Sequence, residues 1–215
     1  MNDIEETGGA KIGMAHASWP FARLSVNKTV LQLNASIIGN LYFRPSDIVS
    51  IEPAGFFSGG GIRIHHRVEK YSSKVVFLTS GSVDLINRIR ACGFLDNTGP
   101  IPSDVEANIA KYQAQGSLPM KWSAVVVFIV VWNLLFLGDL FNFFNNPGSP
   151  LGNGARLAMG FAFLFVLLTL IAEPFRALVL KEGRNVKDVK AFLLFLMFLT
   201  GTGFVMTTVF LHIGK

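Results

Sequence analysis

The sequence predicts an α+β membrane protein. Its polar N-terminal half is expected to fold as an antiparallel β roll or barrel capped by one helix, and its C-terminal half as an all-α bundle of three transmembrane helices. Two observations lead to this fold class. Short segments of alternating apolar and polar residues fill the first half, and three long apolar runs fill the second. The overall hydrophobic content of 51% therefore averages two parts of different character.

The predicted β domain covers residues 14–95, and residues 1–13 are expected to be a flexible N-terminus. Residues 1–9 are polar and acidic, without the basic stretch and apolar core of a cleaved secretory signal. The first apolar run is therefore expected to direct membrane insertion. Cys92 is the single cysteine, which excludes an internal disulfide framework and disfavours a metal site built from cysteines.

Alternating apolar residues between turn signals predict six or seven short strands in this domain, six of them with defined bounds. In chain order they are Trp19–Val26, Val30–Leu33, Leu41–Arg44, Val49–Ile51, Ile62–Val68 and Val75–Leu78. The first two are expected to form a hairpin at Asn27 and Lys28, because asparagine tolerates left-handed backbone angles. Pro45 and Pro53 limit the fourth strand on either side, because proline cannot donate a ladder hydrogen bond.

One helix is expected after the last strand. Ser82 is its predicted N-cap, and Gly93 is expected to end it. Its apolar residues fall on one face, which is expected to cover the β roll: Leu85, Ile86, Ile89 and Cys92.

Four segments of this half follow a known pattern: RLSV at residues 23–26, LYFRPSDIVSIE at 41–52, GIRIHH at 61–66 and KVVF at 74–77. In this order they resemble the bacterial pleckstrin-homology-like (PH-like) domains of the GRAM type. The resemblance implies a binding or assembly module beside membrane helices in a bacterial multi-pass protein. Phosphoinositide-binding PH domains carry several basic residues at the first hairpin tip. This chain offers only Lys28 there, which argues against specific phosphoinositide recognition.

Arg63, His65 and Arg67 occupy alternate positions of one predicted strand and should share one face. Such a face attracts anionic lipid headgroups, at about 1 kcal/mol per basic residue near a charged leaflet. The alternative is an ordinary solvent-facing strand surface. Zinc binding is disfavoured, because the adjacent His65 and His66 should point to opposite faces and no further ligands lie nearby.

Phe56 and Phe57 precede a glycine run in a loop between two predicted strands. Their rings are candidates for contact with the membrane interface or with a protein partner. The alternative is that they fold back onto the core. The glycine run lacks the lysine and hydroxyl residue that end a phosphate-binding P-loop.

Each of the three apolar runs is long enough for a helix to cross a ~30 Å hydrocarbon core at ~1.5 Å per residue. They are residues 122–144, 157–180 and 191–213. The linker at 96–121 is predicted to contain a short amphipathic helix that begins with a capping box at Ser103–Glu106 and lies on the membrane or on the domain. Small residues at Ala158 and Ala162, and at Gly203 and Thr207, are expected to pack the three helices together.

The formal net charge of +5 is explained by membrane topology, without a nucleic-acid partner. The loop before the third run is basic, whereas the loop after the first run carries only Arg156. The basic residues of the former are Arg176, Lys181, Arg184, Lys187 and Lys190. By the positive-inside rule this loop faces the cytoplasm. We therefore expect an inner-membrane protein with a cytoplasmic N-terminal domain and an outside C-terminus.

Polar side chains in the apolar runs are candidate functional groups. Asn133, Asp139 and Glu173 would be the residues of an ion or proton path. Asp139 falls near the outer end of the first run, whereas Glu173 and Arg176 fall near the inner end of the second. The expected role of Glu173 and Arg176 is therefore a local ion pair, with a kink or helix end at Pro174.

No nucleophile elbow, zinc-protease motif or pair of carboxylates at catalytic spacing occurs in the sequence. The sequence therefore predicts a protein without enzymatic activity or cofactor. It is expected to hold a binding or assembly module at the inner leaflet, in contact with anionic lipids or a protein partner. A second copy of the chain is another candidate partner. The alternative is a small channel or transporter subunit.

Overall fold

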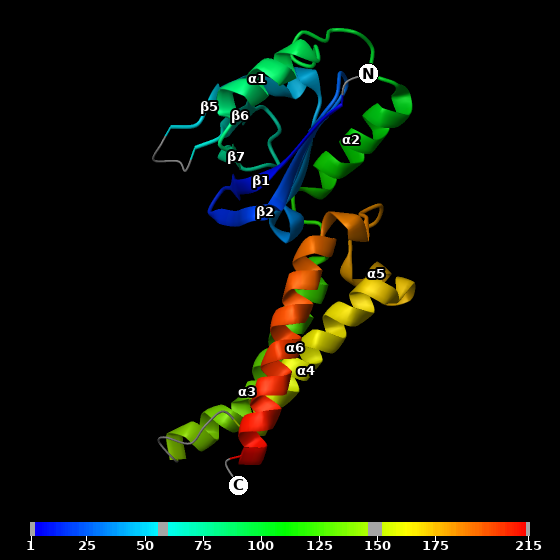
Figure 1. The fold of residues 1–215 in the computed structure, drawn as a ribbon. Helices are drawn as coiled ribbons and strands as arrows, with labels where there is room; N and C mark the ends of the chain where they lie inside the picture. Colours follow the sequence, from blue (N-terminus) through cyan, green and yellow to red (C-terminus); the bar gives the residue numbers. More distant parts are fainter. Residues whose placement is uncertain (1–2, 56–59, 146–151, 214–215) are drawn as a thin grey trace. The chain divides into compact units, whose positions relative to one another are not determined.

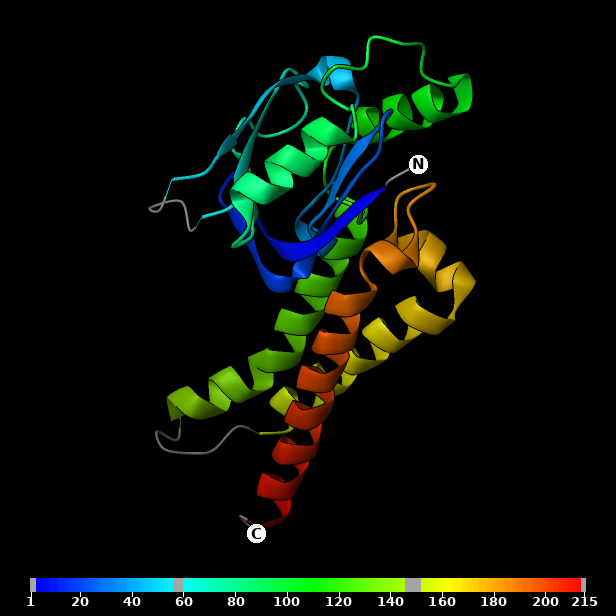
Figure 2. The same ribbon diagram turned by 45° about the horizontal axis from the view of Figure 1, so that its top comes forward.

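The computed structural model describes residues 3–55, 60–145 and 152–213, and Figures 1 and 2 show its ribbon. The chain separates into two compact units, Met1–Pro119 and Met120–Lys215. We call them the β unit and the helical unit, and each is described by itself.

Seven antiparallel strands form one curled sheet, a half-barrel, in the order β4-β3-β2-β1-β7-β6-β5 (Figure 1). Their bounds are β1 (Ile4–Ile12), β2 (Ala15–Val26), β3 (Leu31–Asn34), β4 (Asn40–Phe43), β5 (Ile48–Pro53), β6 (Ile62–His66) and β7 (Val75–Leu78). The short 3-10 helices η1 (Ser36–Ile38) and η2 (Pro45–Asp47) lie between strands. The antiparallel architecture predicted from the alternating pattern is confirmed.

The expected flexible N-terminus at residues 1–13 is wrong, because Ile4–Ile12 forms β1 in the middle of the sheet. β1 pairs with β2 on one side and with β7 on the other. Its glycines interrupt the apolar alternation that would mark a strand in the sequence, but they allow the strand to pair closely. A Cβ at Gly8 would lie 2.3 Å from the main-chain oxygen of Leu78, so only glycine permits this close approach.

The β2–β3 turn is built by a side chain. Asn27 Oδ1 accepts hydrogen bonds from the main-chain N–H groups of Thr29 and Val30, both at 2.9 Å. This is an Asx-type turn. The predicted hairpin at Asn27 and Lys28 is confirmed, but Asn27 does not adopt left-handed angles, since Ser36 is the only non-glycine residue with positive φ in the described part of the chain.

Helix α1 (Ser82–Ala91) packs on the sheet through Leu85, Ile86 and Ile89, as its apolar face predicts. Its N-cap is Gly81, whose carbonyl accepts from Leu85 N, so the predicted capping role of Ser82 is wrong. The core lies between α1 and the curled sheet. Its largest fully buried side chains include Phe43, Phe77 and Phe94.

Helix α2 (Ser103–Gln115) belongs to the β unit, which decides between the two predicted positions for the linker helix. Tyr112 stacks on Tyr42 of β4, with ring centroids 4.3 Å apart. Gln113 Nε2 donates to the Tyr42 carbonyl at 2.9 Å and to Asp47 Oδ2 at 2.7 Å. The predicted boundary at residue 95 is therefore too early. Pro102 is the N-cap of α2 and no side chain caps it, so the predicted capping box is also wrong.

The helical unit contains α3 (Trp122–Asn145), α4 (Asn153–Ile171), α5 (Glu173–Val179), the 3-10 helix η4 (Val186–Asp188) and α6 (Lys190–Ile213). Three of its helices, α3, α4 and α6, are long and apolar enough to cross a membrane. The first and third predicted runs match α3 and α6 closely. The second does not, because the helix breaks at Ala172 and Pro174 occupies the first turn of α5.

Helices α4 and α6 pack closely, because each helix places an aromatic ring against a glycine of the other. A Cβ at Gly160 of α4 would lie 3.2 Å from the ring of Phe204, and a Cβ at Gly201 of α6 would lie 3.2 Å from the ring of Phe163. Glycine at these two positions therefore lets each helix receive a ring of the other. Ala158 and Ala162 are buried on α4, which agrees with the predicted packing of the helices through small residues.

Candidate functional site

A basic pocket of about 340 Å³ opens on the β unit. We define it by the residues that line it, which are Lys11, Gly13, Arg63, His65, Ser73, Lys74 and Val76. They come from β1, β6, β7 and the turns beside these strands.

Cross-strand register explains why these residues meet. Val76 of β7 lies opposite Lys11 of β1 on one side and opposite Arg63 of β6 on the other. The main-chain N–H of Gly13 also bonds to the Lys74 carbonyl at 2.9 Å. Because side chains alternate along a strand, residues two positions apart point to the same face. Arg63 and His65 of β6 therefore lie on the same surface of the sheet as Lys11 and Lys74.

The pocket lining holds four basic side chains and no carboxylate. Glu52 lies beside it on β5, opposite Arg63 in register, with Oε2 3.8 Å from His65 Nε2. The lining as a whole is cationic, so the pocket is suited to an anionic group such as a phosphate or a sulfate. Among the described residues, no three metal-ligating side chains gather in a metal-binding arrangement.

The structure brings together two of the three residues predicted for the basic face, Arg63 and His65. Arg67 follows the end of β6 and is not among the lining residues. Lys11 and Lys74 were missed, because they lie far from Arg63 in the sequence and only the pairing of β1, β7 and β6 joins them. The predicted roles of Phe56 and Phe57 fall outside the described residues.

His66 lies next to this pocket in sequence but belongs to the interior. Its ring packs against Phe43 and Tyr71, with ring centroids 5.0 Å and 6.1 Å away. Its Nε2 donates to the Ser72 carbonyl at 2.9 Å, while Nδ1 is buried without a hydrogen-bond partner. Burial lowers the pKa of His66 from its ordinary value of 6.5. The burial of the ring therefore favours the neutral form of His66.

Asp139, a candidate for an ion path, caps a helix. Its Oδ2 accepts from the main-chain N–H groups of Gly152 at 3.0 Å and Ala155 at 2.7 Å, and its Oδ1 accepts from Gly154 at 3.0 Å. These groups form the N-terminus of α4, whose own N-cap residue, Gly152, has no side chain to offer. A carboxylate is favoured there, because it satisfies free N–H groups and faces the positive end of the helix dipole.

Arg176 acts at the other end of the same helix. Its Nε and NH2 atoms donate to the carbonyls of Thr169 at 3.2 Å and Leu170 at 2.7 Å, in the last turn of α4. The break at Ala172 lets α5 fold back far enough for this contact. The predicted ion pair of Glu173 with Arg176 is wrong, since it is not among the ion pairs of the described residues.

Four further polar side chains of the spans bond to carbonyls of their own helices. Asn133 Nδ2 donates to Ile129 O at 2.8 Å, and its side chain is exposed on α3. Thr169, Thr200 and Thr207 donate to the carbonyls four residues earlier, at 2.8–2.9 Å. Asn133 and Asp139 therefore make no polar contact with each other.

Comparison with known proteins yields no relative: no protein family, no curated protein and no solved structure matches this chain. The fold alone therefore defines the class of protein. It combines an antiparallel β half-barrel with a helical unit in which three helices are able to cross a membrane.

Proposed function

We propose that this protein is a non-enzymatic, multi-pass membrane protein that presents its β unit to anionic lipid headgroups at the cytoplasmic face of the membrane. The observation that carries the proposal is the basic pocket. Three lysine or arginine side chains and His65 surround it on a unit whose chain continues into three candidate membrane spans. We assign the contact with headgroups to Lys11, Arg63, His65 and Lys74.

Charge and position both support this function. Basic residues near an anionic leaflet contribute about 1 kcal/mol each, so several of them together give a useful attraction. The side chain of Met14 is fully exposed and follows Gly13 of the pocket directly. An exposed apolar side chain beside basic residues is typical of surfaces that touch the membrane interface.

The PH-like identity of the β unit is part of the proposal. A curled antiparallel sheet with α1 packed on it supports this identity, and the resemblance of the sequence segments agrees with it. The orientation rests on the charges of the loops. The segment between α4 and α6 is rich in lysine and arginine and would face the cytoplasm.

The contacts in the helical unit favour an anchoring role over a channel. Asp139 and Arg176 bond to the two ends of α4, and Asn133 bonds to its own helix. Asp139 and Arg176 bond to main-chain N–H and carbonyl groups that would otherwise be unsatisfied at the ends of α4. Asn133 bonds to a carbonyl one turn earlier in its own helix. Structural capping therefore accounts for Asp139 and Arg176, at the two ends of α4.

Lysine labelling of the full chain in nanodiscs tests the headgroup contact. Discs of phosphatidylcholine alone are compared with discs that contain phosphatidylglycerol, with a water-soluble amine reagent and peptide mapping by mass spectrometry. We expect Lys11 and Lys74 to be protected in the anionic discs, and the protection to fall at high salt. Lys28, at the β2–β3 turn, is the internal reference.

Arg63→Gln should reduce the protection of Lys74, because it removes one charge from the pocket. Arg90→Gln, which removes an exposed charge on α1, is the matched control. Equal labelling of Lys74 in both kinds of disc would contradict the headgroup function and leave a protein partner as the occupant. A reporter fused after Lys215 tests the orientation, which is wrong if the reporter is cytoplasmic.

A further inference from the structure

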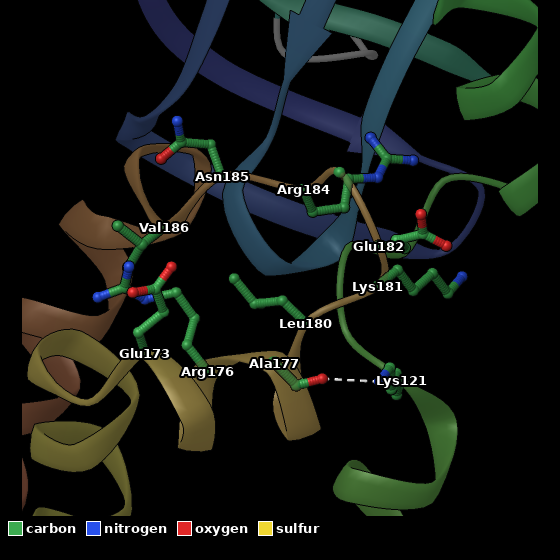
Figure 3. A pocket seen from close by; sticks show the side chains of 11 residues that line it. Lys121, Glu173, Arg176, Ala177, Leu180, Lys181, Glu182, Arg184, Asn185 and Val186 are labelled. Atoms are coloured by element: carbon green, nitrogen blue, oxygen red, sulfur yellow. Dashed lines mark hydrogen bonds between the residues drawn. The ribbon is translucent and has the colours of Figure 1, made fainter.

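A second cavity, of about 730 Å³, lies entirely within the helical unit (Figure 3). We call it the loop pocket and define it by Lys121, Glu173, Arg176, Ala177 and residues 180–186. Its volume is in the range of pockets that hold small molecules. None of the proposed headgroup residues of the β unit lines it, so it is a separate site.

The loop pocket lies where the chain enters and leaves the spans. Lys121 directly precedes α3, and the 180–186 segment connects α5 to η4 and α6. Main-chain bonds hold the two sides together, since Lys121 N donates to Val179 O at 2.8 Å and Met120 pairs with Leu180. The Lys121 Nζ also donates to the Ala177 carbonyl at 2.7 Å (Figure 3). The pocket walls are therefore fixed relative to each other.

The lining is more basic than acidic, with four cationic side chains against two carboxylates. The cations are Lys121, Arg176, Lys181 and Arg184, and the carboxylates are Glu173 and Glu182. Burial, and then repulsion from Arg184, lower the pKa of Lys181 from its ordinary value. An anion in the pocket would relieve that repulsion. A phosphate suits such a lining, because its oxygens accept from several lysine and arginine donors at once.

Apolar side chains beside the pocket indicate where the phosphate comes from. Trp122, the first residue of α3, is 69% exposed, and Leu178 of α5 is 67% exposed. Tryptophan next to lysine at the start of a span is typical of the membrane interface, where lipid headgroups lie. A lipid bound here would place its phosphate among the basic side chains and its chains along these apolar residues.

We propose that the loop pocket binds the phosphate of an anionic membrane lipid, with Lys181 and Arg184 as its main contacts. Basic pockets between membrane helices on the cytoplasmic side are a recognised setting for headgroups. The role of such a lipid would be to hold α3, α5 and the 180–186 segment together. This inference does not rest on the function proposed for the basic pocket of the β unit.

Native mass spectrometry of the full chain, stripped of lipid in detergent, tests the proposal. Phosphatidylglycerol and phosphatidylcholine are titrated separately, and their dissociation constants are compared. We expect phosphatidylglycerol to bind more tightly. Lys181→Gln should weaken its binding about fivefold, the change that corresponds to about 1 kcal/mol for one basic contact.

Two further variants make the test independent of misfolding. Lys187→Gln removes the same charge from η4, one residue beyond the 180–186 segment and outside the pocket lining, and it should leave the affinity unchanged. Glu173→Gln removes a carboxylate from the lining and should tighten phosphatidylglycerol binding several-fold. A damaged fold cannot produce that gain. Labelling of Lys74 should stay the same in all three variants, which separates this site from the basic pocket.

Three results would overturn the proposal. Equal affinity for both lipids would show that the site does not select an anion. Equal losses in Lys181→Gln and Lys187→Gln would show that only bulk charge matters. The third concerns the source of the phosphate: if glycerol 3-phosphate or inorganic phosphate at millimolar concentration displaces phosphatidylglycerol, the pocket takes a soluble anion and the lipid is not its ligand.

Discussion

The carboxylate of Asp139, near the end of α3, accepts a 2.7 Å hydrogen bond from the main-chain N–H of Ala155 in the first turn of α4. Together with its bonds to Gly152 and Gly154, this contact makes a side chain of one helix the capping group for the N-terminus of the next. Arg176 provides the opposite charge at the other end of α4. The single most buried span is thus capped at both ends by side chains from its neighbours.

Removal of the Asp139 carboxylate should destabilise the helical unit. We expect Asp139→Ala to cost about 1–2 kcal/mol, the value of a lost N-cap with its dipole interaction. Asp139→Asn should cost less, because its amide retains one acceptor oxygen. The melting temperature of the full chain in detergent measures the loss, and Asn153→Ala, which changes an exposed residue of the same turn, is the control. Unchanged melting of Asp139→Ala would contradict the capping role.

Gly154 should not tolerate a methyl group. A Cβ there would lie 2.5 Å from the Leu135 carbonyl oxygen and 3.0 Å from Asp139 Cγ, so Gly154→Ala must push α4 away from α3. Gly138→Ala on α3 meets nothing within 4 Å. This matched control should be neutral or slightly stabilising, because alanine is the better helix former. The two variants should therefore differ in melting temperature in detergent, and equal values would show that the close approach is unimportant.

His66 should make the stability of the β unit depend on pH. Its pKa in the folded state is below its ordinary value of 6.5, so the unfolded chain takes up a proton first as the pH falls. The stability that depends on neutral His66 is therefore fully present above about pH 6.5. It decreases as the pH falls below this value, and it stops decreasing once the pH is below the pKa of His66 in the folded state. Hydrogen exchange of the β6 and β7 amides in the full chain, corrected for intrinsic rates, measures this change.

His66→Gln should flatten that pH dependence, because glutamine keeps a donor for the Ser72 carbonyl but does not titrate. His16→Gln removes an exposed histidine and should leave the dependence as it is. If His66→Gln and the native chain lose protection equally between pH 7 and pH 5.5, His66 is not the group responsible.

Gln113 should hold α2 on the β unit. Gln113→Ala removes the hydrogen bonds to the Tyr42 carbonyl and to Asp47, and we expect a loss of about 1–2 kcal/mol from the docking of α2. Faster hydrogen exchange in Ser103–Gln115 would report that loss. Asn108→Ala, on the exposed side of the same helix, should not change the exchange. The docking contact is unimportant if the two variants exchange alike.

Local sequence patterns predict most of the strands and helices. Alternation predicts β2 to β7, and long apolar runs predict α3 and α6 nearly to the residue. The exception among the strands is β1, whose GG pair interrupts any apolar alternation. That pair is needed for a close approach to β7, and a requirement set by a distant strand leaves no periodic signal near β1 itself.

The candidate sites divide in the same way. Arg63 and His65 share a strand, so their spacing predicts a common face. Lys11 and Lys74 join them through strand pairing that spans most of the β unit, which no local spacing reveals. Glu173 and Arg176 show the reverse error. Both residues lie on α5 at a spacing that suits an ion pair, but the break at Ala172 turns the Arg176 guanidinium toward the carbonyls of Thr169 and Leu170 at the end of α4.

The sequence by itself determined that a β-rich polar unit precedes three apolar helices, because side-chain periodicity and run length are local properties of the chain. Only the tertiary structure decided which charged side chains act together. The capping of α4 by Asp139 and Arg176 and the gathering of Lys11, Arg63, His65 and Lys74 all depend on segments that meet after folding. Hydrogen bonds and charge interactions act over a few ångströms, so the sequence alone does not reveal which of these residues come into contact.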